Sequence, residues 1–243
     1  MNTTRDTVLN GAVVLVQPET GFRAGLDSLL LASAVEAAPS ACLLDLGCGA
    51  GGAMLPLAWR RPDLTLTGID ADPDMLALCR QGIAANGVET RCDVLEADAR
   101  SLPAEWENRF DGVFSNPPFF EAGRTSQPGP GKQAAYIGSL TLSDWLGVML
   151  HVTRPRGAVY VIHRAAELAS ILAVLDRRAG EIEILPVRAH PGAEAKRVLI
   201  RARKGLRRGP VRLLEGLTLA PERGGAPTPR YGEVLAGQAL AWR

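Results

Sequence analysis

The stretch ACLLDLGCGAGGAMLPLAWR, residues 41–60, decides the fold of this chain. It opens with an apolar run that predicts a buried strand, and it closes with GAMLPLAWR, which has the pattern of a helix. Between them, Gly47, Gly49 and Gly51 allow the backbone to turn sharply and to approach a ligand, because no Cβ stands in the way. A strand, a glycine-rich turn and a helix in direct succession are typical of an open α/β sheet.

The alternation of strand-like and helical segments continues along the chain. Strands are predicted at residues 41–46, 64–70, 90–98, 110–115, 157–163, 181–189 and 195–203, and helices at 52–60, 72–86, 143–154 and 166–179. A short loop joins the last two strands, so they form a hairpin and not a crossover. The pattern predicts a Rossmann-like α/β fold.

Shorter elements flank this core on both sides. Ahead of it, a hairpin at 7–16 is predicted to turn at Asn10-Gly11, and a helix is predicted at 26–38. Behind it lie one strand candidate (212–219) and a weak helix (231–241), separated by a Gly/Pro-rich stretch. We therefore expect an N-terminal hairpin and helix (1–40), a central domain (41–205) and a C-terminal appendage of the same domain (206–243).

The composition describes an ordinary globular protein, since 47% of the 243 residues are hydrophobic and 22% are charged. No window approaches the ~20 apolar residues of a membrane-spanning helix, and the N-terminus lacks the features of a signal peptide. The four cysteines form no C-x-x-C pair and the three histidines lie far from them, so we expect reduced thiols and no metal site. Together these features predict a cytoplasmic protein.

Three acidic residues are predicted to meet at one edge of the sheet. Asp45, Asp70 and Asp98 lie at or near the ends of the first three core strands. Ligands bind at the edge where the carboxyl ends of parallel strands meet, so we expect Asp70 to hold a ribose and Asp98 an adenine amino group. The glycine spacing is G-x-G-x-G and not the dinucleotide fingerprint G-x-G-x-x-G. A carboxylate at Asp45 suits S-adenosylmethionine, whose amine and sulfonium are cationic.

The strand at 110–115 runs into Asn116-Pro117-Pro118-Phe119. The two prolines fix φ and remove backbone donors, so carbonyls remain as the polar groups. Pro117 also restricts Asn116 to an extended conformation. The Asn116 side-chain oxygen and the Pro117 carbonyl can accept the two hydrogens of an amino group and localise its lone pair, and Phe119 can stack on a base. The motif predicts methyl transfer to an exocyclic amino nitrogen, a reaction in which positioning dominates.

These motifs resemble those of class I S-adenosylmethionine-dependent methyltransferases. The resemblance implies a seven-stranded, mostly parallel sheet with an antiparallel last strand. It also implies a cofactor site, which we expect to contain Asp45, Gly47, Gly49, Gly51, Asp70, Asp98 and Asn116. GFRAGLDSLLLA, NPPFF, TLSDWL and AKRVLIRARKG are similar to segments of the valine-tRNA adenine-N6 methyltransferase family. In that family the segment before the first strand packs near the cofactor, so Asp27 is either a cofactor-pocket residue or a helix N-cap.

A basic stretch from Arg188 to Arg212 contains nine Lys or Arg residues and one acidic residue, Glu194, although the whole chain carries a net charge of +1. Such clusters are typical of nucleic-acid surfaces. A long loop at 121–133 also carries positive charge and is predicted to close over the target base. The predicted nucleic-acid-binding residues are Arg124, Lys132, Arg201, Arg203, Lys204, Arg207 and Arg208, with Arg188 and Lys196 on the same pair of strands.

The leading interpretation is methylation of N6 of an unpaired adenine in tRNA or another RNA, because a loop base need not be flipped out of a duplex. A protein glutamine methyltransferase would share the Asn-Pro-Pro site but would not need the basic stretch. A regulatory subunit that binds S-adenosylmethionine without catalysis would not need an intact Asn-Pro-Pro-Phe motif. A nicotinamide dehydrogenase is disfavoured by the glycine spacing. The sequence leaves the RNA species, the modified position and the oligomeric state open.

Overall fold

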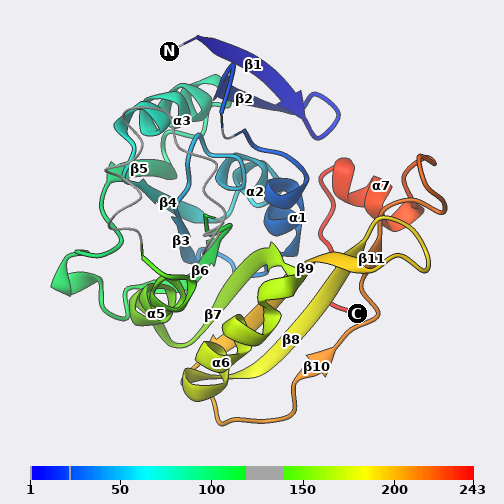
Figure 1. Ribbon diagram of the computed structural model, residues 1–243. Helices are drawn as coiled ribbons and strands as arrows, with labels where there is room; N and C mark the ends of the chain where they lie inside the picture. The colour runs from blue at the N-terminus through cyan, green and yellow to red at the C-terminus, as the bar shows by residue number, and fades with distance from the viewer. Residues whose placement is uncertain (1, 22, 119–139) are drawn as a thin grey trace, which may run out of the picture.

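A mostly parallel sheet forms the centre of the computed structural model, which describes residues 2–21, 23–118 and 140–243 (Figure 1). Within these residues the strands lie in the order β10-β8-β9-β7-β6-β3-β4-β5, and β11 pairs with β8. The strands are β3 (Cys42–Leu46), β4 (Thr65–Asp70), β5 (Cys92–Glu96), β6 (Phe110–Ser115), β7 (Thr153–Arg164), β8 (Ala179–Arg188), β9 (Ala195–Lys204), β10 (Arg212–Leu213) and β11 (Leu217–Thr218). All seven predicted core strands are present, with ends that differ by a few residues.

Strand β9 runs opposite to its neighbours, so its two ends lie at opposite edges of the sheet. Strands β3 to β7 run parallel to one another, whereas β9 is antiparallel to both β7 and β8. This confirms the expected mostly parallel sheet with an antiparallel last strand. The described part of the sheet has nine strands and not seven, because β10 and β11 add two short strands parallel to β8. The first residues of β9 lie beside the carboxyl ends of the parallel strands, and its last residues lie at the opposite edge.

Helices cover both faces of the sheet (Figure 1). One face packs against α1, α2, α3 and α7, and the other packs against α5 and α6. The helices are α1 (Leu26–Ala34), α2 (Met54–Arg60), α3 (Pro73–Ala85), α5 (Leu142–Val152), α6 (Leu168–Arg178) and α7 (Pro229–Leu235), with short 3-10 turns η1 (Ala104–Trp106) and η2 (Ala165–Glu167). Neighbouring residues of β6, Val113 and Phe114, face opposite layers and are both fully buried. This burial on both faces explains why the core strands read as continuous apolar runs.

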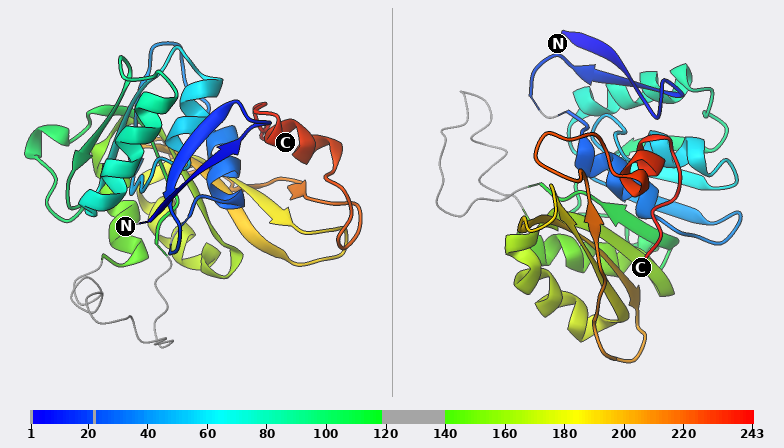
Figure 2. Two further views of the ribbon diagram at one scale, coloured as in Figure 1. Left: turned by 90° about the horizontal axis from the view of Figure 1, so that it is seen from above. Right: turned by 90° about the vertical axis from the view of Figure 1, so that its right-hand side faces the viewer.

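A separate antiparallel hairpin, β1 (Thr3–Val8) and β2 (Val13–Pro18), stands beside α3 (Figure 2). The predicted hairpin at 7–16 with a two-residue turn was wrong in its bounds, because four residues separate the two strands. Two residues that rarely do so take positive φ in this loop, Leu9 at 53° and Asn10 at 55°, and Gly11 follows at 88°. The Asn10-Gly11 pair therefore lies within the turn as expected, but it closes a wider loop.

Helix α3 begins and ends with the residues that its sequence predicts. The Asp72 side chain accepts hydrogen bonds from the backbone amides of Asp74 (2.9 Å) and Met75 (3.3 Å), which confirms it as the N-cap. At the other end, the Asn86 side chain donates to the Val14 carbonyl (2.7 Å) and accepts from the Val14 amide (2.9 Å). These two bonds attach the N-terminal hairpin to the core.

The C-terminal residues continue the sheet at its outer side. The single strand expected at 212–219 is split into β10 and β11 by a bend at Gly216, whose φ is +93°. A Cβ at Gly216 would lie 2.3 Å from the Pro186 carbonyl oxygen, so only glycine allows this close approach to β8. Helix α7 is shorter than the expected 231–241, with Thr228 as its N-cap.

Candidate active site

The glycine loop after β3 is held against the end of β4 by backbone hydrogen bonds. The amides of Gly47 and Cys48 both donate to the Ile69 carbonyl at 2.9 Å, and the Gly49 amide donates to Oδ2 of Asp70 at 2.9 Å. Gly47, Gly49 and Gly51 all have positive φ, at 75°, 52° and 84°. The loop geometry therefore requires the three glycines that the sequence singled out.

Trp145 of α5 explains why position 47 has no room for a side chain. A Cβ at Gly47 would lie 2.9 Å from Cζ2 of the Trp145 ring. The indole Nε1 donates to Oγ of Ser115 (2.9 Å), and that hydroxyl donates to the Leu46 carbonyl (2.6 Å). This chain of contacts fixes the ends of β3 and β6 to α5, so the glycine loop and the residue after Ser115 are positioned together.

Asp45 is a buried carboxylate with an unsatisfied acceptor. Its side chain is 2% exposed, and its Oδ2 atom has no hydrogen-bond partner among the described residues. Burial raises the pKa of Asp45 well above the usual range for a carboxyl group, and the nearby charge of Asp70 raises it further. A buried polar atom without a partner is costly, so the site fits a ligand that carries positive charge.

Asp70 and Asp98 differ in their surroundings. Asp70 is partly buried at the end of β4, and its carboxylate also accepts from the Asp72 amide at 2.9 Å. Burial raises the pKa of Asp70. Asp98 lies two residues beyond the end of β5, is partly exposed, and forms an ion pair with Arg100 (2.5 Å) that lowers its pKa. The two acids thus lie at the same edge of the sheet, but backbone amides hold Asp70 whereas a side chain pairs with Asp98.

Asn116 follows directly after β6 and has the second unsatisfied oxygen of the site. Its Oδ1 atom is buried and has no hydrogen-bond partner among the described residues. Pro117 beside it is buried and Pro118 is exposed. The other predicted residues of this region, Phe119, Arg124, Lys132 and the loop 121–133, lie outside the described residues.

A cavity of about 410 Å³ opens beside Asn116. Its walls come from the start of α1 (Asp27), the end of β8 (Arg188) and the start of β9 (Lys196 and Arg197). Asp27 forms an ion pair with Arg197 at 2.7 Å, and the N-cap of α1 is Gly25. Of the two interpretations of Asp27, the structure excludes the helix cap and places the residue in the wall of this cavity.

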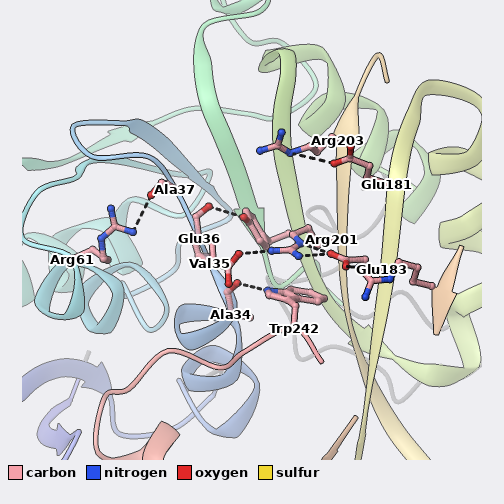
Figure 3. Close-up of polar contacts among 12 residues, drawn as sticks. Ala34, Val35, Glu36, Ala37, Arg61, Glu181, Glu183, Arg201, Arg203 and Trp242 are labelled. Carbon is pink, nitrogen blue, oxygen red and sulfur yellow. Dashed lines mark hydrogen bonds and ion pairs between the residues drawn. The ribbon is translucent and has the colours of Figure 1, made fainter. Parts of the chain in front are cut away.

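The residues of the basic stretch lie at two opposite edges of the sheet, and Arg201 lies between them within β9. Figure 3 shows its guanidinium between Glu36 and Glu183, with Trp242 packed against it. The Trp242 indole Nε1 donates to the Ala34 carbonyl at 2.8 Å. We therefore correct the expectation that Arg201 contacts phosphate, because its charge is already matched by the buried carboxylate of Glu183 and the exposed one of Glu36.

Lys204 and the residues after it lie at the edge of the sheet opposite the cavity. The Lys204 ammonium donates to the carbonyls of Thr153 (2.7 Å) and His151 (3.1 Å), at the start of β7. Arg203 pairs weakly with Glu181, at 3.8 Å, and Arg208 pairs with Asp176 at 2.7 Å. Arg207 is exposed directly before Arg208. From Arg197 to Lys204 the strand extends about 23 Å at 3.3 Å per residue, so these cations do not adjoin Asn116.

The cations that do line the cavity are Arg23, Arg188, Lys196 and Arg197. Arg188 and Lys196 were expected on a nucleic-acid surface, but Arg23 and Arg197 were not. The signal for Arg197 was present in the sequence: a hairpin that follows a parallel strand returns its second strand with its first residues at the carboxyl edge. Arg23 comes from a segment whose position only the folded structure defines.

No helix within the described ranges is both long and apolar enough to cross a membrane. The same residues contain no group of three or more His, Cys, Asp or Glu side chains that could hold a metal ion.

The open sheet, the glycine loop after β3, the acids at its carboxyl edge and Asn-Pro-Pro after β6 together define a class I S-adenosylmethionine-dependent methyltransferase. A family model described as the methyltransferase small domain matches residues 23–128. The chain is 30% identical over 212 residues to a tRNA1(Val) (adenine(37)-N6)-methyltransferase of Aeromonas salmonicida, which covers 86% of this chain and 87% of the relative. The chain belongs to the tRNA1(Val) (adenine(37)-N6)-methyltransferase family.

Solved structures of methyltransferases share the fold of this chain. A predicted O-methyltransferase from Agrobacterium tumefaciens superposes with a TM-score of 0.72 and 27% identity, over 90% of this chain and 99% of that one. A 16S rRNA N2-methyltransferase of Thermus thermophilus, solved with AdoMet and guanosine, gives a TM-score of 0.57 and 21% identity, over 84% of this chain and 50% of that one. The second likeness shows the fold alone.

Proposed function

We propose that the protein transfers a methyl group to N6 of an unpaired adenine in tRNA. The observation that carries the proposal is the Asn116 side-chain oxygen, which is buried and unpartnered in the described structure, on a residue that lines a cavity with four cations. An acceptor in such a place fits an amino group on an anionic polymer. The similarity to tRNA adenine-N6 methyltransferases supports the same substrate. A cytoplasmic location is part of this proposal, since the substrate is tRNA.

The described residues fit S-adenosylmethionine as the cofactor. Asp45 offers a buried, unpaired carboxylate oxygen to a cationic group, and Gly47 and Gly49 leave the loop free of side chains on the way to it. In the proposed set Asp70 holds the ribose hydroxyls and Asp98 the adenine amino group, and Gly51, Asp27 and Asn116 complete it. When bound, the cofactor supplies an electrophilic methyl group on its sulfonium.

The protein's own contribution to the reaction is to position and polarise the target amino group. The lone pair of an exocyclic amino nitrogen is delocalised into the base. Hydrogen bonds from its two N–H groups to Oδ1 of Asn116 and to the Pro117 carbonyl localise that lone pair on nitrogen. No strong general base is needed if the proton leaves after transfer. The stacking role of Phe119 and the phosphate contacts of Arg124 and Lys132 rest on the sequence alone.

The proposal is tested by comparing the modified nucleosides of RNA from cells with and without the protein. Nucleoside mass spectrometry of total RNA with and without the gene should show the loss of N6-methyladenosine from the tRNA fraction. Purified protein should methylate an unmodified tRNA transcript at an adenine in a loop and leave the same adenine unmodified when it is paired in a duplex. Efficient methylation of a glutamine peptide without any RNA product would overturn the proposal in favour of a protein glutamine methyltransferase. No transfer to either substrate, despite cofactor binding, would favour a regulatory subunit.

A further inference from the structure

The cavity beside Asn116 carries an excess of positive charge that the protein does not neutralise. Four cations line it against one acid, Asp27. Two of the four are already paired: Arg197 with Asp27 at 2.7 Å, and Arg23 with Asp6 at 2.5 Å. The charges of Arg188 and Lys196 remain without a carboxylate partner among the described residues.

Arg188 is held in place but left with hydrogen-bonding capacity. Its Nε atom is buried and has no partner among the described residues, and its Nη2 donates only a long bond, 3.4 Å, to the Glu215 carbonyl. A buried guanidinium N–H without an acceptor is costly in a folded protein, and Arg188 lines a cavity from which a ligand can supply one. Arg188 pairs in register with Ala195, which places Lys196 at the next position of the same hairpin.

We infer that Arg188 and Lys196 form an anion subsite that binds a backbone phosphate of the RNA next to the target adenine. The inference rests on the proposed function and names the part of the substrate that the β8–β9 hairpin recognises. A guanidinium and an ammonium that open into one cavity suit a phosphate, which accepts hydrogen bonds from both. The subsite shares its cavity with Asn116, so phosphate binding there orients the nucleotide whose amino group Asn116 accepts.

The cofactor's carboxylate is the other anion that this pair of residues could meet. The glycine loop follows β3, and four strand spacings separate β3 from β8 across β6, β7 and β9. At about 4.8 Å for each spacing, the distance is roughly 19 Å. Arg188 therefore lies on the far side of Asn116 from the glycine loop, Asp70 and Asp98, which favours the RNA phosphate.

The test compares two double variants that each remove two positive charges. Arg188→Gln with Lys196→Gln removes the subsite, and Arg207→Gln with Arg208→Gln removes the same charge at the opposite edge of the sheet. For each protein, binding of an unmodified tRNA transcript is measured over a salt series, together with kcat and KM for methyl transfer and calorimetric affinity for S-adenosylmethionine. A swapped variant, Arg188→Lys with Lys196→Arg, keeps the charge and controls for folding.

Loss of the subsite should flatten the slope of log affinity against log salt by about 0.7, since one phosphate contact on a single strand contributes about 0.7. The KM for tRNA should rise roughly tenfold or more, while cofactor affinity stays the same. The variant at the opposite edge should change the slope by less than half as much, and the swapped variant should keep it.

Equal slopes for the two double variants, or a wild-type slope in the subsite variant, would overturn the inference. The proposed function would still stand in that case if the wild-type protein methylates tRNA. Weakened cofactor binding with an unchanged slope would reassign the two residues to the cofactor's carboxylate. If the wild-type protein methylates no RNA, the proposed function and the subsite both fall.

Discussion

The cavity beside Asn116 and the cluster around Arg201 are both built with charged residues from one basic stretch, yet they differ in how their polar groups are satisfied. Around Arg201, two carboxylates and an aromatic ring surround one guanidinium, and Glu183 also pairs with Arg212 at 2.5 Å (Figure 3). Around the cavity, Asn116 and Arg188 each keep a buried polar atom without a partner in the described structure. The cluster around Arg201 therefore stabilises the fold, whereas the cavity combines unpaired buried atoms with space in which a ligand can meet them.

The largest effect is expected from Asn116→Ala, at the centre of the unsatisfied region. Methyl transfer to tRNA should fall by roughly 10²–10³-fold, as when one preorganised hydrogen-bonding group is removed from an active site. The affinity for S-adenosylmethionine should stay within about tenfold, because the amide acts mainly on the substrate nitrogen. Single-turnover kinetics and calorimetry measure the two quantities. Comparable activity in the variant would refute the proposed role of the motif.

Substitution in the cluster around Arg201 should lower the stability of the protein and leave its methyl-transfer activity unchanged. Arg201→Met leaves the buried Glu183 carboxylate with a weaker set of partners, and the free energy of unfolding should fall by about 3 kcal/mol. Arg203→Met on the same strand is the matched control, since its ion pair with Glu181 is exposed and long, and it should cost less than about 0.5 kcal/mol. Urea unfolding measures both. Equal losses would mean that the cluster contributes no more than a surface ion pair.

Asp70→Ala tests whether the acids at the carboxyl edge hold the cofactor. The affinity for S-adenosylmethionine should weaken by about 2 kcal/mol, because hydrogen bonds to a charged acceptor contribute about 1.5–3 kcal/mol. Asp98→Ala should weaken this affinity less, since Asp98 is partly exposed and pairs with Arg100. Calorimetry on both variants gives the order. An unchanged affinity for Asp70→Ala would place the cofactor elsewhere.

The smallest predicted effect concerns the pH dependence that Asp45 confers. Burial raises the pKa of Asp45 in the folded protein above its unfolded value of 3.8. The folded state then binds more protons than the unfolded state between these two values, so the free energy of unfolding falls as pH rises through this interval and stays low above it. Asp45→Asn cannot ionise and should be more stable than wild type near neutral pH, by on the order of 1 kcal/mol.

S-adenosylmethionine should stabilise wild type more than Asp45→Asn, because a bound cation compensates the buried carboxylate. Chemical unfolding at several pH values, with and without the cofactor, measures both differences. A variant with the wild-type pH profile would show that folding does not raise the pKa of Asp45.

The sequence predicted the elements that depend on local signals. The helix at 72–86 was predicted from its local apolar pattern, and the structure begins and ends it within one residue of those bounds. The hairpin at 7–16 was mispredicted because Asn10-Gly11 fits a two-residue turn, whereas pairing over the whole of β1 and β2 sets a wider loop. The strand at 212–219 was mispredicted because its bend depends on the approach of Gly216 to Pro186, a contact that no local pattern contains.

For the site, the sequence by itself determined which residues gather at the carboxyl edge of the sheet. Glycine spacing, proline pairs and acids at strand ends act within a few residues, so Gly47, Asp70 and Asn116 could be named without coordinates. Only the tertiary structure decided which cations line the cavity beside Asn116. Arg201 and Glu36 are 165 residues apart along the chain, and the pairing that neutralises Arg201 exists only once β9 has packed beside α1. Because β9 is antiparallel to β7 and β8, Arg188 and Lys196 lie beside Asn116, and Lys204 lies at the opposite edge of the sheet.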